Sequence, residues 1–239
     1  MNIEAAIRRP RPVKIMASDF WLLKKSGAFA GYSKSELLDG ELWGVPVQDE
    51  NEPESDAVYR IPLRIQDYER LCDAGAFLAH RKTELIDGLV YAMNPQYRPH
   101  GYVNDELAYR LRTALEHMGS NLHVATEQSV ALPPRDETEP DIILTTSPRG
   151  VGAIPGESVA LLVEVSDSTV HFDLNDKARV YASGGVAKYW VVDVTTGVIH
   201  RMWSPQGETY AKRREVKFGE RIEAATIEGL AVETAGLNS

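Results

Sequence analysis

Apolar residues between positions 100 and 119 recur every three or four residues, which is the spacing of an amphipathic helix. Gly119 is well placed to end this helix. The predicted helix therefore buries one face and exposes the other. Its apolar positions are Val103, Leu107, Leu111, Ala114 and Met118.

Beyond this helix the apolar positions fall mostly in short, nearly unbroken runs, which are typical of buried strands. A second helical pattern covers 173–185, where Gly184 and Gly185 mark the exit. Helices and strands in this order predict an α/β or α+β fold with a mixed central sheet flanked by helices. The predicted strands lie within 121–132, 139–144, 159–165, 187–194, 197–203 and 208–216.

The N-terminal third contains an internal repeat. Residues 19–40 and 67–88 align without a gap at an offset of 48, and 10 of the 22 positions are identical. Each copy predicts a short helix followed by a hairpin whose turn is an Asp-Gly pair. The acidic, polar stretch between the copies is typical of a linker. We therefore expect a duplicated helix–hairpin unit.

Composition narrows the class of protein. Of 239 residues, 43% are hydrophobic and 26% charged, which suits a globular protein with a sizeable core. The sequence has no signal-peptide pattern, no apolar run of membrane-spanning length, and only Cys72 as a thiol, so we expect a cytoplasmic protein. The net charge of −9 counts against strong non-specific binding to nucleic acid but leaves room for a local basic groove.

Two acidic residues lie at the ends of predicted buried strands. Glu164 follows the apolar run 159–163, and Asp141 precedes the apolar residues of 142–144. If the strands are neighbours, the carboxylates converge and need a cation or a shared proton. Hard oxygen ligands favour Mg²⁺ or Mn²⁺. The alternative is structural, with Asp141 capping a turn and Glu164 paired with an arginine.

Lys177 belongs to the apolar stripe of the second helix, three residues after Leu174 and four before Tyr181. An inward lysine needs an anionic partner, and this helix follows the strand that carries Glu164. The alternative is that the ammonium group reaches water past Tyr181. Asp173 is interpreted as a helix cap.

Several stretches together resemble the Uma-type restriction endonuclease family of the PD-(D/E)xK nuclease superfamily. They are "TELIDGLVYAMNP", His100 at the start of a helix, "EPDIIL", "LLVEVSDST", "DLNDKARVYASGGVAKYWVVD" and "IEGLAV", in that order over residues 60–235. The resemblance implies a restriction endonuclease-like fold in which a mixed sheet is flanked by helices.

The resemblance also implies site residues. Asp141 and Glu164 would bind Mg²⁺, and Ser166 stands at the position that usually holds the lysine. The family places its lysine on the following helix, as Lys177 does here. Glu84 would add a carboxylate at the edge of the site, and His100 would contact the substrate.

For the domains, we predict an N-terminal extension over 1–58 and a nuclease-like domain over 59–239. The first repeat copy lacks any following "PD" or "ExS" stretch, so it is not a second active site. It packs beside its twin, where it extends the sheet, or it mediates self-association into a homo-oligomer.

The leading hypothesis is a Mg²⁺-dependent endonuclease that hydrolyses phosphodiester bonds in DNA. The second is a nuclease-fold protein that no longer cleaves and serves as an interaction module. A metal-free carboxylate-pair hydrolase is disfavoured because an ammonium group nearby opposes the raised pKa that such a pair needs. Candidate phosphate contacts are Arg81, Lys82, Arg98, Arg110, Arg112, Lys212, Arg213 and Arg214.

Overall fold

The computed structural model of the chain describes residues 10–48 and 57–237, and it falls into two compact units. Among these residues, unit 1 contains Pro10, 94–132 and 137–237, and unit 2 contains 11–93 and 133–136. Helices and strands are mixed along the chain, so the predicted α+β class is confirmed. Both copies of the repeat lie in unit 2, whereas the predicted domain boundary falls between them at 58 and 59.

Unit 1 is built on a six-stranded mixed sheet with the strand order β15-β14-β13-β12-β10-β7. The central pair β12 and β13 is parallel, and the remaining neighbours are antiparallel. The strands are β7 (His123–Thr126), β10 (Ile142–Thr145), β12 (Val159–Ser166), β13 (Lys188–Asp193), β14 (Val198–Gln206) and β15 (Thr209–Lys217).

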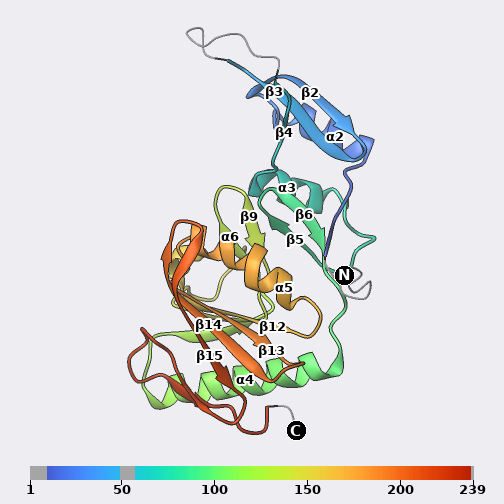
Figure 1. The fold of residues 1–239 in the computed structure, drawn as a ribbon. Helices are drawn as coiled ribbons and strands as arrows, with labels where there is room; N and C mark the ends of the chain where they lie inside the picture. Colours follow the sequence, from blue (N-terminus) through green and yellow to red (C-terminus); the bar gives the residue numbers. More distant parts are fainter. Residues whose placement is uncertain (1–9, 49–56, 238–239) are drawn as a thin grey trace. The chain divides into compact units, whose positions relative to one another are not determined.

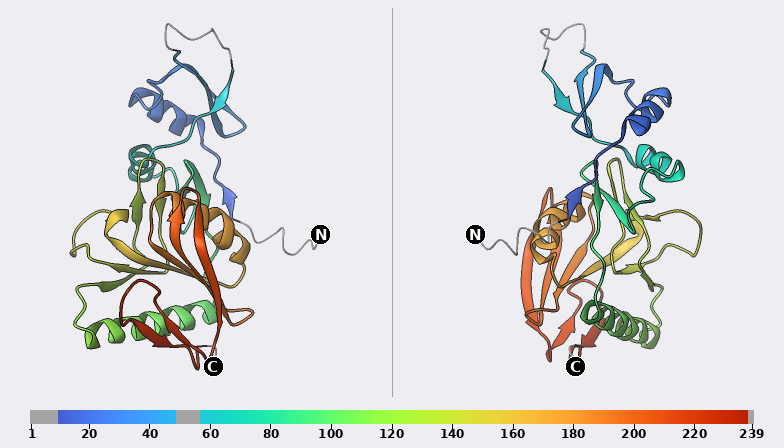
Figure 2. Two further views of the ribbon diagram at one scale, coloured as in Figure 1. Left: turned by 60° about the vertical axis from the view of Figure 1, so that its left-hand side comes forward. Right: turned by 90° about the vertical axis from the view of Figure 1, so that its right-hand side faces the viewer.

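Helices cover both faces of this sheet (Figures 1 and 2). The helix α4 (Arg98–His117) lies across one face, and its buried side chains join a core with the alternate residues of β10, β12 and β13. On the other face a helical segment runs through α5 (Val170–Phe172), η2 (Asp173–Lys177) and α6 (Ala178–Ser183). There the ring of Tyr181 packs edge-on against Tyr189 of β13, with centroids 4.7 Å apart.

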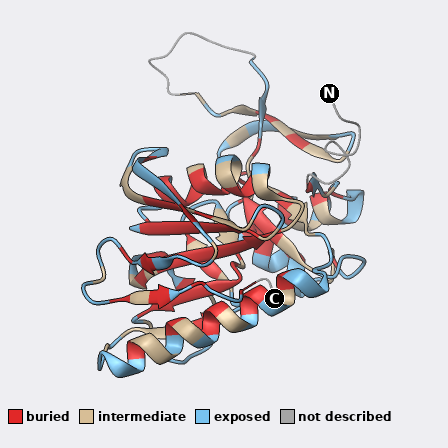
Figure 3. Ribbon diagram, turned by 60° about the horizontal axis from the view of Figure 1, so that its bottom comes forward, coloured by how far each residue is buried: buried red, intermediate tan, exposed pale blue. Residues whose placement is uncertain are grey.

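Burial along α4 follows the predicted periodicity. In Figure 3 the ribbon of α4 alternates between buried and exposed turns, while the strands behind it are buried almost throughout. The central strands are apolar on both faces, which explains why their sequences are nearly unbroken apolar runs. The remaining short elements are β8 (Val130–Leu132), β9 (Asp136–Thr138), β11 (Ile154–Pro155), η1 (Gly156–Ser158), β16 (Arg221–Glu223) and β17 (Ala231–Glu233).

In unit 2, equivalent parts of the repeat form equivalent helices and hairpins. The helix of the first copy is separated from that of the second by the repeat offset, and each is followed by two antiparallel strands. The first copy contains β1 (Arg11–Pro12), α2 (Ala17–Lys25), β2 (Tyr32–Leu38) and β3 (Glu41–Pro46). The second contains β4 (Tyr59–Arg60), α3 (Ile65–Asp73), β5 (Thr83–Ile86) and β6 (Leu89–Ala92).

The two copies exchange their first strands. β1 pairs with β6 of the second copy, and β4 pairs with β3 of the first. Backbone hydrogen bonds repeat the exchange: Val13 N donates to Val90 O over 2.7 Å, and Ile61 N donates to Leu42 O over 2.8 Å. Both copies also contribute to one apolar core, which makes them a single folding unit.

The hairpin turns of the two copies need glycine for the same reason. Gly40 and Gly88 have φ values of 76° and 70°, in the left-handed region. A Cβ atom at Gly40 would lie 2.5 Å from Lys14 Cβ, and one at Gly88 would lie 2.4 Å from Pro62 Cβ. The Asp-Gly pairs noted in the sequence therefore close both hairpins tightly against the segments that follow β1 and β4.

Candidate active site

The ends of β10 and β12 place Asp141 beside Glu164. These antiparallel strands pair Ile142 with Val163, so the residue before Ile142 meets the residue after Val163. The backbone N–H of Val165 donates to Asp141 Oδ2 over 2.7 Å, which fixes the carboxylate against the neighbouring strand. Asp141 and Glu164 therefore stand opposite each other on adjacent strands, and both are buried.

Two further donors hold the Asp141 carboxylate from the start of α4. His100 Nε2 lies 3.2 Å from Oδ2, and Gln96 Nε2 donates to Oδ1 over 3.0 Å. Only 4% of the Asp141 side chain and 8% of the His100 side chain are exposed. Because a buried carboxylate is costly without hydrogen bonds, these donors are what allow Asp141 to face the interior. His100 contacts Asp141, and its predicted contact with the substrate stays a prediction.

Glu164 receives two donors from the helical segment on the opposite face of the sheet. Lys177 Nζ lies 2.9 Å from Glu164 Oε1, and the Tyr181 hydroxyl donates to the same oxygen over 2.7 Å. Lys177 and Glu164 expose only 4% and 7% of their side chains. Lys177 therefore points inward, and the alternative that its ammonium group reaches water is wrong. Glu164 is paired with this lysine.

A π-helical turn over 173–177 carries Lys177 to this position. The backbone N–H of Ala178 bonds to the carbonyl of Asp173, five residues earlier, and that carbonyl also accepts from the Tyr189 hydroxyl over 3.1 Å. Such widened turns often occur where a helix supplies functional side chains. Here the turn precedes α6, so Lys177 and Tyr181 follow one another on the same helical face.

Asp173 forms a second buried acidic centre next to Glu164. Its carboxylate accepts hydrogen bonds from the hydroxyls of Ser166 and Thr169, the latter over 2.6 Å. Burial raises the pKa of Asp173, and Lys177 and the two hydroxyls oppose that shift. The interpretation of Asp173 as a helix cap is wrong, because helical structure begins earlier, at Val170. The Ser166 side chain therefore serves this carboxylate.

Glu84 belongs to the other unit. It is buried on β5, and Lys82 Nζ lies 3.6 Å from its carboxylate. Its predicted part in the chemistry stays a prediction. Arg110, one of the candidate phosphate contacts, bonds to Glu106 and to the backbone carbonyls of Glu233 and Ala235, which gives it a structural role.

Two residues of the site were not singled out from the sequence. Gln96 lies in an irregular segment before α4, and no spacing rule marks it. Tyr181 was recognised only as part of an apolar stripe, and its hydroxyl was not considered. The signal was available in principle, since the hydroxyl of a buried tyrosine usually finds a hydrogen-bond partner.

The donor set suits a hard divalent cation that is only partly coordinated by protein. Asp141 and Glu164 supply carboxylate oxygens from adjacent strands, and Mg²⁺ is commonly held by one or two carboxylates plus waters and substrate phosphates. Over 10–48 and 57–237, no group of three or more His, Cys, Asp or Glu residues is arranged to hold a metal ion. The described residues therefore fit a two-carboxylate site, not an all-protein cage.

Comparison with known proteins agrees with the resemblance seen in the sequence. The profile of the Uma2 family, described as "Putative restriction endonuclease", matches residues 65–235. Among solved structures, the chain is similar to a putative nuclease belonging to DUF820 from Anabaena variabilis ATCC 29413. That match has 13% sequence identity and a TM-score of 0.48, and it covers 63% of this chain and 87% of the other. No curated protein sequence matches the chain significantly.

Proposed function

Because the chain belongs to the Uma2 family of putative restriction endonucleases, we propose that it is a Mg²⁺-dependent endonuclease that hydrolyses phosphodiester bonds in DNA. The observation that carries this proposal is the meeting of Asp141 and Glu164 at adjacent strand ends, with the buried ammonium group of Lys177 on Glu164. Two carboxylates and a lysine in one buried cluster are the groups that metal-assisted phosphodiester hydrolysis requires.

In this proposal Asp141 and Glu164 hold the Mg²⁺ ion. When bound, the ion would polarise the phosphate and lower the pKa of a water molecule. Gln96, His100 and the backbone of Val165 keep the Asp141 carboxylate in a fixed orientation. Preorganised ligands of this kind bind without rearranging first.

Lys177 is the residue that acts on the reacting atoms. Its ammonium group, 2.9 Å from Glu164 Oε1, is held next to the metal ligand, where it orients the attacking water or offsets negative charge that develops on the phosphate. Tyr181 shares that oxygen and fixes the carboxylate between the two donors. His100 is proposed as the residue that positions Asp141.

One observation favours the alternative of an inactive interaction module. Both donors from the helical segment converge on a single oxygen of Glu164, and no three-ligand group is present among the described residues. A cluster that is already satisfied internally is able to stabilise the fold without any metal. A measurement of metal binding distinguishes the nuclease from the inactive module, because only the nuclease needs the metal.

The test is calorimetric titration of Mn²⁺ into the wild type and into Asp141→Asn and Glu164→Gln, with Glu215→Gln as a control carboxylate on exposed β15. We expect saturable binding in the wild type and control, and a loss of at least tenfold in affinity in each site variant. Cleavage of plasmid, genomic and short duplex DNA is then measured with Mg²⁺ and Mn²⁺. If both site variants still bind Mn²⁺ like the wild type, Asp141 and Glu164 are not the metal ligands. If the wild type neither binds metal nor cleaves DNA, the interaction module is favoured.

A further inference from the structure

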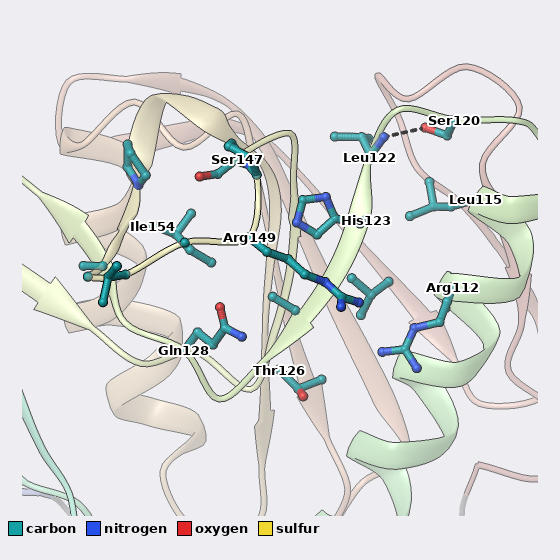
Figure 4. A pocket seen from close by; sticks show the side chains of 18 of the residues that line it. Arg112, Leu115, Ser120, Leu122, His123, Thr126, Gln128, Ser147, Arg149 and Ile154 are labelled. Atoms are coloured by element: carbon teal, nitrogen blue, oxygen red, sulfur yellow. Dashed lines mark hydrogen bonds between the residues drawn. The ribbon is translucent and has the colours of Figure 1, made fainter.

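A groove of about 1160 Å³ runs beside the edge strand β7 in unit 1. One wall is the C-terminal half of α4, and the other is the segment 147–155, which follows β10 (Figure 4). The strand itself forms the floor. Polar lining residues include Arg112, Glu116, His123, Thr126, Gln128 and Arg149.

The groove is a local basic site in an acidic chain. Arg112 reaches in from α4 and Arg149 from the opposite wall, and their side chains extend toward each other over β7 with His123 above them (Figure 4). Glu116 is the one carboxylate among the lining residues. Within the described part of the chain, neither arginine takes part in an ion pair, unlike the neighbouring Arg110.

One end of the groove meets the end of the sheet that carries the carboxylates. Thr126, which lines the groove, pairs with Ile142, and the N–H of Glu127 donates to Asp141 O over 3.3 Å. Along α4, Arg112 lies twelve residues beyond His100, which corresponds to about 18 Å of helix. That length matches about five phosphate steps along a duplex, at about 3.4 Å per step.

The exposed face of α4 adds aromatic side chains to the same path. Tyr102 and Tyr109 are seven residues apart, and Arg112 follows Tyr109 by three, so all three lie on one side of the helix. The two tyrosines expose 73% and 63% of their surface. Aromatic rings beside arginines are the usual platform for nucleic-acid strands, because bases stack on the rings while the arginines contact phosphates.

We propose that this groove binds a nucleic-acid strand, with Arg112 and Arg149 on phosphates about five steps away from the bond to be cleaved. The inference rests on the proposed nuclease function and names the surface by which the substrate is held. A peptide that adds a strand to β7 fits less well, since β7 is only 4 residues long and two unpaired arginines overhang it. A basic groove also explains how a protein with a net charge of −9 binds a polyanion.

Fluorescence anisotropy tests the proposal with a labelled 30-base-pair DNA duplex and the matching single strand, in EDTA and at several salt concentrations. The variant Arg112→Gln/Arg149→Gln is compared with Arg213→Gln/Arg214→Gln, which makes the same charge change in the competing candidate for phosphate contacts, on β15 at the opposite edge of the sheet. We expect at least a tenfold higher Kd for the groove variant with one or both probes. We also expect a salt slope reduced by about 2, because each lost phosphate contact removes about 1. The control should bind like the wild type.

Three results would refute nucleic-acid binding by the groove: wild-type DNA affinity in the groove variant, an equal loss of DNA affinity in the control, or no binding of either probe by the wild type. If the groove binds a protein instead, the groove variant should keep wild-type DNA affinity. Asp141→Asn keeps this test separate from that of the nuclease. If Asp141→Asn binds DNA like the wild type and the groove variant does not, the groove is supported as the DNA-binding surface even when no cleavage is found.

Discussion

The Tyr181 hydroxyl lies 2.7 Å from Glu164 Oε1, the same oxygen that Lys177 Nζ approaches at 2.9 Å. A strand-end carboxylate is thus oriented by two donors from a single helical face. Hydrogen bonds to a metal-binding carboxylate fix its direction and tune its affinity. The helical segment after β12 therefore does more than supply a lysine: it sets the geometry of the acid.

Tyr181→Phe should reduce Mn²⁺ affinity or cleavage rate about 10- to 100-fold, the usual cost of losing such a supporting hydrogen bond. The ring remains to pack against Tyr189, so the thermal unfolding temperature should change little. Calorimetry and a cleavage assay on the same preparation measure both effects.

Tyr210→Phe is the matched control, because Tyr210 is also buried but donates to the Val186 carbonyl, away from the site. Burial raises the pKa of Tyr210 above its usual range, so the hydroxyl stays protonated. If the two variants weaken metal binding equally, the effect is general loosening of the core and the special role of Tyr181 is refuted.

Lys177→Met should lower the rate of cleavage without weakening the binding of metal. Methionine keeps the apolar part of the side chain but removes the ammonium group, so the cleavage rate should fall about 10²- to 10³-fold. Mn²⁺ affinity should be retained or rise, since a cation that competes for Glu164 has been removed. Loss of Mn²⁺ binding together with activity would instead show that Lys177 acts only by holding the site together.

The raised pKa of Asp173 predicts the sign of the pH dependence of stability. Burial raises the pKa of this carboxyl, so the folded state keeps a proton that the unfolded chain releases, and stability falls as pH rises from about 4 through the raised pKa. Asp173→Asn removes this titration while an amide oxygen still accepts from Ser166 and Thr169. Its unfolding temperature should match the wild type near pH 4 and exceed it by a few degrees at pH 7, since about 1 kcal/mol shifts it by about 2–4 °C.

Thermal unfolding from pH 4 to 8 in EDTA checks this prediction, with Asp176→Asn on the same helical turn as a charge-matched control. A wild type that gains stability over Asp173→Asn as pH rises would reverse the sign and refute it.

Local patterns were enough to predict the centre of the fold and the placement of Asp141 and Glu164 on adjacent strands. Unbroken apolar runs identify strands that are buried on both faces, and an acid at the end of such a run has to be satisfied by a neighbour. Lys177 was predicted to point inward because it shares a helical stripe with Leu174 and Tyr181. These inferences depend only on spacing and burial.

What the sequence did not predict depends on tertiary contacts. Gln96 reaches Asp141 from an irregular segment, where no periodicity marks a side chain as inward. The π turn over 173–177 breaks the regular helical register and is held by the distant Tyr189. The exchanged strands β1 and β4 have 2 residues each, too few for any period to show.

The exchange of first strands makes a specific prediction about truncation. Deleting 1–58 removes β1, which pairs with β6, and half of the core shared by the two copies. Residues such as Leu63 and Leu71 would then lose their apolar partners, at a cost of about 2–5 kcal/mol for each large side chain left beside a cavity. Proteolysis within 59–93 should become at least tenfold faster than in the full chain, as mass spectrometry of the fragments would show.

Deleting only residues 1–9 is the control, because it leaves β1 and every other described strand intact. Light scattering on both truncations tests the hypothesis of self-association at the same time. The 1–58 deletion could resist protease like the full chain, while its particle mass falls by more than the mass of the deleted residues. In that case the repeat serves association, and the exchanged strands are not needed for folding. If the 1–58 deletion becomes protease-sensitive while the full chain is monomeric, the first copy is an internal partner of the second, and the duplicated unit is indivisible.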